Sequence, residues 1–181
     1  MKTWKIDSIH SEVKFKVKHL VVSTVTGQFN NFDAAIVSDN EDFTDARLTF
    51  EADVNSINTN NAMRDGHLKS PDFFDAQNHP KMTFVSKSFK KLSLNEYELT
   101  GDITIRGVTK EIALRVLYNG SAKDMDGSNI AAFEVHGNIN RFDFGLEWNA
   151  LTEAGGFAVG SNVKLEIFAE MKESALLGKA A

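Results

Sequence analysis

The segment SEVKFKVKH, which runs from Ser11 to His19, alternates between two kinds of side chain. Val13, Phe15 and Val17 occupy one set of alternate positions, and glutamate or lysine occupies the other. Successive side chains of a β-strand point to opposite faces, so this strand has one apolar and one charged face. The apolar set ends on His19. The pattern predicts a sheet that curls around an apolar interior and keeps a few polar groups inside.

The same alternation recurs along most of the chain. It is found in residues 47–54, 97–106, 112–118, 133–139 and 163–171. Period-two patterning in stretches separated by short polar turns is typical of an antiparallel sheet. We count about eight such strands, and a closed barrel of about eight strands has an interior wide enough for side chains or one small ligand. The sequence therefore predicts an all-β antiparallel barrel of about eight strands.

One segment, TNNAMRDGHLKS at residues 59–70, breaks the alternation. It begins with residue types that cap helices, and Met63, His67 and Leu68 follow at helical spacing. We expect one short helix from about Asn60 to Lys69 that covers an end of the barrel.

The composition restricts the class of protein. The 181 residues fit one domain, which we place at residues 1–172, and residues 173–181 are expected to form a frayed or helical tail. The absence of cysteine excludes disulfides and thiolate sites. A net charge of -5 argues against a nucleic-acid partner. Neither metal-binding histidine spacing nor a hydrolase or nucleotide motif occurs, so no metal site and no catalytic residue is expected.

The sequence also bears on location. No stretch approaches the roughly 20 apolar residues of a membrane-spanning helix, so we expect no integral membrane segment. The opening residues, Met-Lys-Thr-Trp, lack the apolar core of a signal peptide. The sequence as written predicts a cytoplasmic protein, and a periplasmic one if a signal peptide has been removed.

Six blocks of sequence, met in order from Trp4 to about Met171, together carry a resemblance to a known family. They are WKIDSIHS at 4–11 leading into FKVKHL at 15–20, GQF at 27–29, SINT at 56–59 with RDGHL at 64–68 and DFF at 72–74, PKMTFVS at 80–86, GDITIRGVT at 101–109, and RFDFG at 141–145. Any one block is weak, but six in this order are specific. On these blocks the chain resembles the YceI-like family of lipocalin-like, polyisoprenoid-binding proteins.

The resemblance implies a lipocalin-like antiparallel barrel with a long hydrophobic cavity. Members resemble carriers of isoprenoid quinones or polyprenyl chains, and homodimers are common among them. We therefore expect non-enzymatic binding or carriage of a long-chain apolar small molecule, either an isoprenoid quinone or a polyprenyl phosphate. The same resemblance implies a homodimer and no cofactor other than a bound isoprenoid or long-chain lipid.

Residues on the inward phase of the predicted strands are candidates to line this cavity. They are Val13, Phe15, Val17, His19, Phe29, Phe50, Phe84, Ile103, Leu114, Phe133, Phe144 and Ile167. The same residues would serve a packed barrel core without a void, and sequence alone does not separate the two interpretations.

Polar residues near the predicted barrel ends are candidates for contact with a ligand head group. They are His19, Arg64, Asp65, His67 and Arg141. His19 could donate to a head group such as a quinone carbonyl, or be a core histidine bonded to its neighbours. Arg64 and Asp65 could instead pin the helix to the barrel, and Arg141 could form a structural ion pair.

Two other functions stay open on the sequence. One is an enzyme that acts on a lipid or quinone with His19 as acid–base group, which needs a second titratable group within hydrogen-bond reach. The other is a packed barrel whose role is structural or is contact with a partner.

Overall fold

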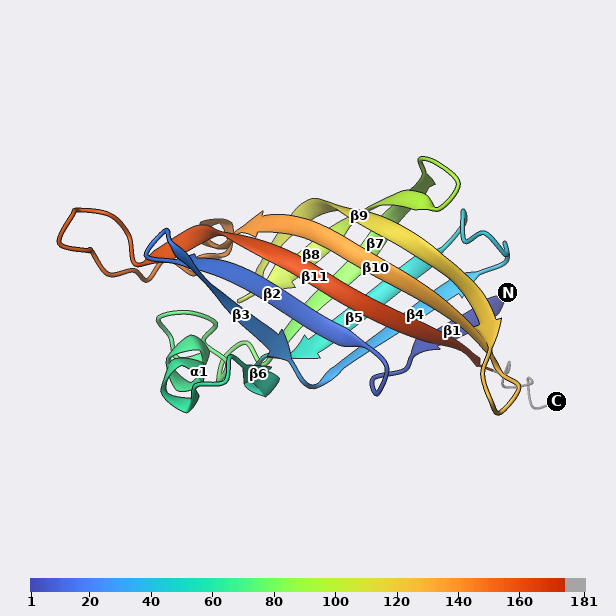
Figure 1. The fold of residues 1–181 in the computed structure, drawn as a ribbon, viewed down its shortest axis with the longest axis horizontal. Coiled ribbons are helices and arrows are strands. Elements are labelled where there is room, and N and C mark those ends of the chain that lie inside the picture. The colour runs from blue at the N-terminus through green and yellow to red at the C-terminus, as the bar shows by residue number, and fades with distance from the viewer. Residues whose placement is uncertain (175–181) are drawn as a thin grey trace.

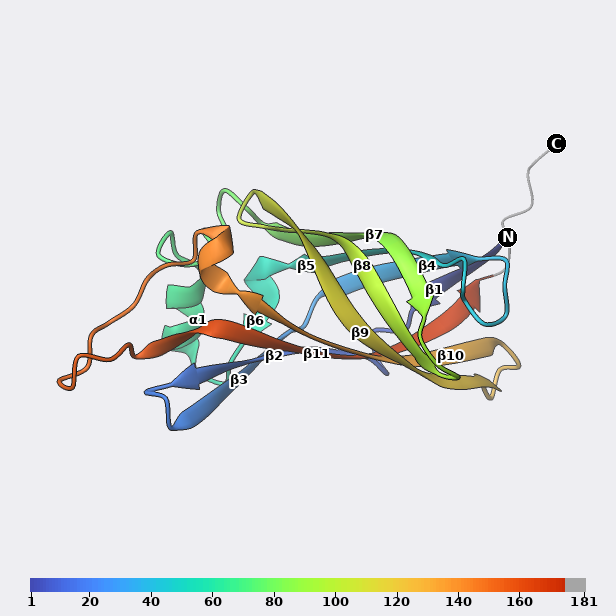
Figure 2. The same cartoon turned by 90° about the horizontal axis from the view of Figure 1, so that it is seen from above.

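The computed structural model describes residues 1–174, which form one barrel with a helix at one end (Figures 1 and 2). The strands are β1 (Lys2–Ile6), β2 (Glu12–His19), β3 (Ser23–Phe29), β4 (Phe32–Ser38), β5 (Arg47–Asp53), β6 (Ile57–Asn58), β7 (Lys81–Lys91), β8 (Glu96–Ile105), β9 (Val108–Lys123), β10 (Asn129–Asn140) and β11 (Val159–Ser174). The helices are α1 (Ala62–Lys69) and two short 3-10 helices, η1 (Val54–Ser56) and η2 (Arg141–Phe144).

Eight long antiparallel strands build the barrel, and three of them are interrupted. The ring runs β1, β4, β5, β7, β8, β9, β10 and β11, and the pairing of β11 with β1 closes it. β2 pairs with β11, β3 with β2, and β6 with β3. Since β1 and β2, β3 and β4, and β5 and β6 follow each other in the chain, each pair is one long strand with a break. This confirms the predicted antiparallel barrel of about eight strands.

Two of the breaks carry aspartates whose side chains bind the local backbone. Between β1 and β2, the Asp7 carboxylate accepts a hydrogen bond from the N–H of Ile9 at 2.9 Å. Between β5 and β6, the Asp53 carboxylate accepts one from the N–H of Asn55, also at 2.9 Å. Such side chains offer the backbone an alternative to the strand ladder. Because of the first break, the C-terminal part of β11 pairs with β1 and its N-terminal part pairs with β2.

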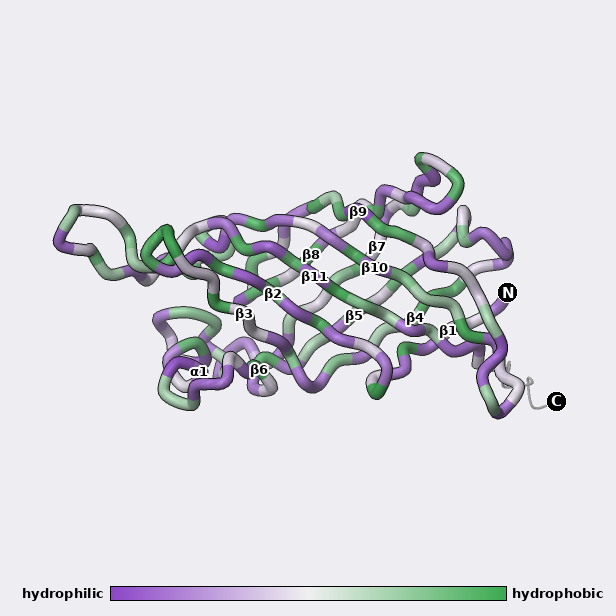
Figure 3. The backbone as a smooth tube through the Cα atoms, in the orientation of Figure 1, coloured by the Kyte–Doolittle hydropathy of each residue, from purple (hydrophilic) through white to green (hydrophobic). Residues whose placement is uncertain are grey.

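The pairing of β2 places its apolar residues opposite those of its neighbours. Phe15 lies opposite Leu165 of β11 and opposite Gly27 of β3. The charged face points outward, where Lys16 forms an ion pair with Glu166 at 2.6 Å. Figure 3 shows hydrophilic and hydrophobic residues alternating along the strands, as expected for a sheet with one buried face.

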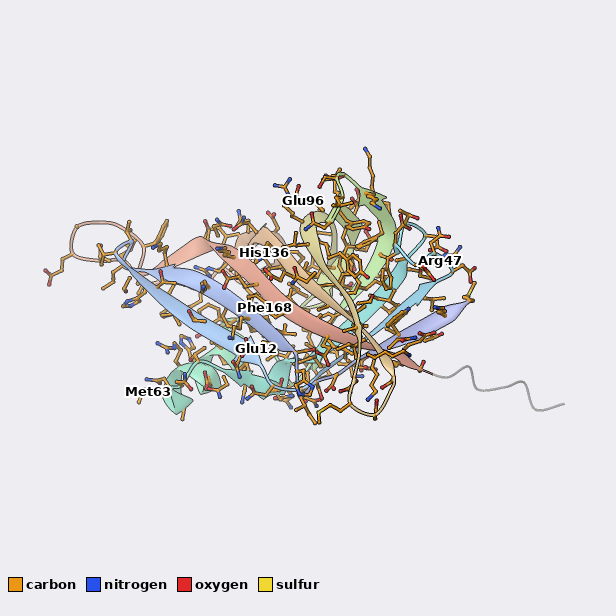
Figure 4. All side chains as sticks on the ribbon, turned by 45° about the vertical axis from the view of Figure 1, so that its right-hand side comes forward. Glu12, Arg47, Met63, Glu96, His136 and Phe168 are labelled. Carbon is orange, nitrogen blue, oxygen red and sulfur yellow. The ribbon has the colours of Figure 1, made fainter. Side chains whose placement is uncertain are left out.

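The predicted helix is confirmed as α1, but it begins at Ala62 rather than Asn60. Asn60 has a positive φ of 60° and Asn61 is extended, so neither belongs to a helical turn. The Asn61 side chain caps the helix by accepting from the N–H of Arg64 at 2.9 Å. α1 lies at one end of the barrel near β6 (Figure 1), and the exposed Met63 points outward from it (Figure 4).

The last strand extends past the predicted end of the barrel domain at residue 172, because β11 runs to Ser174. Its final residues pair with β1, so the first and last strands of the barrel hold each other. The rest of the predicted tail, residues 175–181, lies outside the described residues. Within residues 1–174, no helix combines the length and the apolar character that crossing a bilayer requires.

Candidate ligand-binding site

The barrel encloses two adjoining cavities. The outer cavity, of about 310 Å³, opens beside α1, and the inner cavity, of about 120 Å³, lies deeper in the barrel. The walls of both include Phe15, Phe29, Met82, Ile139 and Leu165. Since they share these walls, the two cavities lie next to each other along the barrel, the outer one at the α1 end.

Every residue predicted to line a cavity lies on the wall of one of these two. The inner cavity is lined by Val13, Phe50, Phe84, Ile103, Leu114, Phe133 and Ile167. Phe15 and Phe29 line both cavities, and Val17, His19 and Phe144 line the outer one. The inward faces of the strands therefore surround space as well as packing against one another.

The inner cavity is apolar and its far end is plugged. Apart from Lys14, all residues on its wall are apolar. Beyond it, the loop between β4 and β5 places Phe43 in the barrel, where its ring lies 5.4 Å from Trp4 and 5.1 Å from Phe133. The hydroxyl of Tyr97 holds this loop by donating to the carbonyl of Asp42 at 2.6 Å. A ligand would therefore enter from the α1 end, which we call the mouth.

Aromatic side chains join two segments at the mouth. The ring of His67, on α1, lies 4.6 Å from that of Trp148, on the loop after η2, and 5.1 Å from that of Phe73. Phe73 and Trp148 are themselves 5.5 Å apart. The Nε2 atom of His67 lies 2.8 Å from a carboxylate oxygen of Asp72. This cluster fixes α1 against the loop and builds one side of the mouth.

Arg141 is a buried cation without an acidic partner among the described residues. It is 4 % exposed, and burial lowers the pKa of its guanidinium. Its donors go to the backbone carbonyls of four residues, Leu146, Trp148, Val159 and Gly160. The structural ion pair considered from sequence is therefore wrong. The guanidinium fork instead ties the loop after η2 to the start of β11, and its positive charge stays at the mouth.

Arg64 and Asp65 both hold the buried Thr59. Arg64 donates through Nε to the Thr59 hydroxyl and through Nη2 to the Thr59 carbonyl, each at 2.7 Å. One oxygen of Asp65 accepts from the N–H of Thr59 at 2.9 Å and from its hydroxyl at 2.6 Å. Arg64 lines the mouth, but Asp65 does not. Asp65 was expected at the head group, but the structure places it outside the lining of the mouth, with one carboxylate oxygen bonded to Thr59.

His19 lies at the rim of the mouth and is exposed, so it is not a core histidine. Strand phase predicted an inward side chain, but β2 ends at this residue and the hairpin to β3 continues beyond the barrel. The Nδ1 atom of His19 lies 3.5 Å from the hydroxyl of Ser23. The second titratable group that acid–base catalysis by His19 would require is absent from its hydrogen-bond partners in residues 1–174.

The mouth carries cations and no carboxylate. Its polar lining consists of Lys18, His19, Thr59, Arg64, His67 and Arg141. No Asp or Glu of the described chain lines it, although the protein has a net charge of -5. The arrangement can hold an apolar chain inside the barrel and an anionic group at the entrance, where local cations attract it.

Sequence reasoning missed several residues of the mouth, and three of them show why. Lys18 is on the outward phase of its strand, yet it lines the mouth because β2 ends there. Thr59 was named as part of a capping pattern and of the SINT block but not as a site residue, and Trp148 belongs to a loop without periodicity. Only the tertiary arrangement brings Trp148 to His67, so no local signal could have found it.

A separate polar cluster joins the turn between β1 and β2 to β11. Ligand atoms of Asp7, His10 and Glu170 all lie within 4.8 Å of one another. His10 Nδ1 is 3.1 Å from Asp7 and 3.6 Å from Glu170. The hydrogen bond to Asp7, and then the nearby negative charges, raise the pKa of His10. These mutual contacts hold the turn in place, and none of the three residues lines either cavity.

Comparison with known proteins identifies a family and a fold. The YceI-like domain matches residues 4–171. A UPF0312 protein of Staphylococcus aureus is 42% identical over 175 residues, which cover 96% of this chain and 99% of that protein. Burkholderia cenocepacia BcnA has the same fold, with a TM-score of 0.80, 22% identity and coverage of 91% and 98%. So does a polyisoprenoid binding domain from Saccharophagus degradans, with a TM-score of 0.66, 15% identity and coverage of 94% and 98%.

Proposed function

Because this chain belongs to the YceI-like family, we propose that it binds one long-chain polyisoprenoid in its barrel and carries it without catalysing a reaction. The observation that supports this best is the pair of adjoining cavities, the inner one apolar and the outer one cationic at its mouth. The Saccharophagus degradans domain of the same fold is named for polyisoprenoid binding. At 15% identity that domain supports the fold alone, so the proposal rests on the cavities of this chain.

The length of the barrel suits an extended chain. β8 has 10 residues, and a strand rises about 3.3 Å per residue, so the wall is roughly 33 Å long. A cavity within such a wall, plugged at the Phe43 end, accepts a linear tail inserted from the mouth.

The head group decides selectivity more than the tail does. Lipid is as apolar as the inside of a protein, so moving a tail from a bilayer to the barrel gains little free energy. Contacts that a bilayer does not offer must then discriminate between ligands. The cationic mouth favours a phosphate over a neutral quinone, because hydrogen bonds to a charged group contribute about 1.5–3 kcal/mol. We therefore place the phosphate of a polyprenyl phosphate beside Arg64 and Lys18.

The homodimer expected from the family resemblance is part of the proposal. Light scattering at micromolar concentration should give twice the 20.1 kDa of one chain. A measured mass of one chain would contradict the dimer, but it would not contradict ligand binding within each barrel.

The test compares Arg64→Met with Asp65→Asn. Arg64→Met removes two hydrogen bonds to Thr59, and Asp65→Asn takes the charge from the oxygen that accepts from Thr59, but only Arg64 lines the mouth. We expect Arg64→Met to lower the affinity for a long-chain polyprenyl phosphate by about 10- to 150-fold in calorimetric titration, since about 1.4 kcal/mol is tenfold. Asp65→Asn should lower the melting temperature and bind almost normally. Equal losses of affinity in both variants would mean that Arg64 acts only through Thr59 and would contradict the assigned head-group contact.

A further inference from the structure

We propose that the protein docks on anionic lipid bilayers through an exposed apolar patch at the rim of the mouth. We call it the rim patch, and it consists of Leu20, Val21 and Val22 at the tip of the β2–β3 hairpin with Leu151 and Phe157 of the neighbouring loop. This surface goes beyond ligand binding, because it concerns where the barrel loads and unloads. None of these five residues lines either cavity.

The rim patch lies on two segments that are hydrogen-bonded to each other at this end of the barrel. The N–H of Leu20 donates to the carbonyl of Ala158 at 2.9 Å, which joins the hairpin tip to the loop. Leu151 and Phe157 face each other across an isolated antiparallel bridge. Val21 is 77 % exposed and Leu151 is 74 % exposed. Both segments project from the same end of the barrel (Figures 1 and 2), and the hairpin tip is hydrophobic in Figure 3.

The backbone of the hairpin tip is strained by the residues it carries. Leu20 has a φ of 51° and Val21 a φ of 67°. Positive φ is uncommon outside glycine and is an outlier for a β-branched residue such as Val21. Asn and Gly are the residues that tight hairpin turns favour at such positions. The chain thus keeps two exposed apolar side chains where polar turn residues would fold better, which points to an apolar contact outside the chain.

The position of the rim patch and the cations of the adjoining mouth fit a bilayer. It borders the mouth directly, because His19 and Val159 are paired and line the mouth just below Leu20. A tail that leaves a bilayer here would enter the barrel without crossing water. The mouth has cations and no carboxylate among the described residues, which complements anionic lipid head groups. The patch is carried on projecting loops, a shape that inserts into lipid and gives a second protein little flat area to cover.

The first test is sedimentation of the ligand-free protein with vesicles of phosphatidylcholine and phosphatidylglycerol. The wild type should sediment, and the half-exposed Trp148 should shift its fluorescence to the blue as the rim enters lipid. The double variant Leu20→Asn/Val21→Gly should bind vesicles at least about tenfold more weakly, because burying one such side chain is worth about that factor. Its melting temperature should be equal or higher, because the new residues suit the turn.

The matched control is Leu94→Asn, which removes an exposed leucine from the hairpin between β7 and β8. It should sediment like the wild type. Wild-type protein that stays in the supernatant, or a double variant that sediments normally, would overturn the proposal. A wild-type dimer that the double variant splits into monomers, without vesicle binding by either, would assign the rim patch to a second copy and also overturn it.

The outcome is separable from that of the proposed function. Polyprenyl phosphate delivered from detergent should bind the double variant as it binds the wild type. Transfer of the same ligand from vesicles should be slower for the double variant. Loss of vesicle binding with normal uptake from detergent supports the docking surface, whereas no uptake by the wild type from detergent contradicts the proposed function alone.

Discussion

A Cβ atom on Gly27 would lie 2.3 Å from the Cζ atom of Phe15, closer than a side chain can approach. The two residues face each other across the β2–β3 pair, and Phe15 lines both cavities. The missing side chain at Gly27 therefore lets the Phe15 ring lie against the barrel wall at the junction of the two cavities. In the proposed function, a long ligand would have to pass this aromatic side chain and the glycine beside it.

We expect Gly27→Ala to push the Phe15 ring from the wall into the junction. Overpacking of this kind costs about 1–3 kcal/mol. A long-chain polyprenyl phosphate should then bind about tenfold more weakly, since about 1.4 kcal/mol is tenfold. Farnesyl phosphate, which needs only the outer cavity, should keep its affinity. Gly66→Ala is the control, because a Cβ there meets nothing within 4 Å. Equal loss for both ligands would show that the ring does not control passage.

The depth of the bound tail can be tested at Ile103. Its side chain lines the inner cavity, whereas Val85, close by on the paired strand β7, is 54 % exposed on the outside. Ile103→Trp should fill the inner cavity and abolish binding of a long-chain polyprenyl phosphate while sparing farnesyl phosphate. Val85→Trp should bind both ligands as the wild type does. Calorimetric titration measures the four combinations, and full long-chain affinity in Ile103→Trp would place the tail elsewhere.

Most of the barrel could be predicted from sequence because alternation is a local property. Val13, Phe15 and Ile103 follow the two-residue period of their strands, and all three line a cavity. Alternation does not reveal where a strand leaves the barrel. For this reason it did not reveal that His19, which lines the mouth, is exposed at the rim rather than buried in the barrel.

The polar residues of the mouth were harder to predict because their roles depend on distant backbone. Arg141 lacks an ion pair in the described chain and bonds instead to carbonyls between Leu146 and Gly160, which no sequence pattern marks. Asp65 lies three residues before Leu68, and nothing in the sequence gives its carboxylate a partner. In the fold, the carboxylate accepts hydrogen bonds from the N–H and the hydroxyl of Thr59. Side-chain type predicted that cations would lie near the mouth. Only the fold determines which of them keep N–H donors that are not already bonded within the protein.

Arg141 should matter for stability more than an exposed arginine does. Arg141→Met would leave buried carbonyls of the loop without donors, and each unsatisfied group costs about 1–3 kcal/mol. We expect the free energy of unfolding in urea to fall by at least that amount, with only partial recovery in Arg141→Lys, which lacks the planar fork. Arg115→Met is the control, because Arg115 is exposed and its pairing with Glu96 is 3.6 Å long. If Arg141→Met lowers the free energy of unfolding no more than Arg115→Met does, this role is contradicted.

The ion pairs of Glu166 should make stability depend on pH. Hydrogen bonds from Lys16 and then Lys164 lower the pKa of this carboxyl from 4.5 to about 2. A depressed pKa in the folded state means that the stabilisation is complete above about pH 4.5 and is lost as pH falls toward 2. Urea midpoints across this range should fall less in Glu166→Gln than in the wild type or in Glu98→Gln. High salt should shrink the difference, because the pair is near the surface. Parallel pH profiles would contradict the assignment.

Binding of one polyisoprenoid inside each barrel is tested most directly by extracting the purified protein with organic solvent and identifying the lipid by mass spectrometry. Protein that is first incubated with a long-chain polyprenyl phosphate and then freed of unbound lipid should yield one equivalent per chain. Ile103→Trp treated in the same way should yield almost none, and Val85→Trp should match the wild type. No recovered lipid from the wild type, or the same amount from Ile103→Trp, would contradict a ligand held in the cavity.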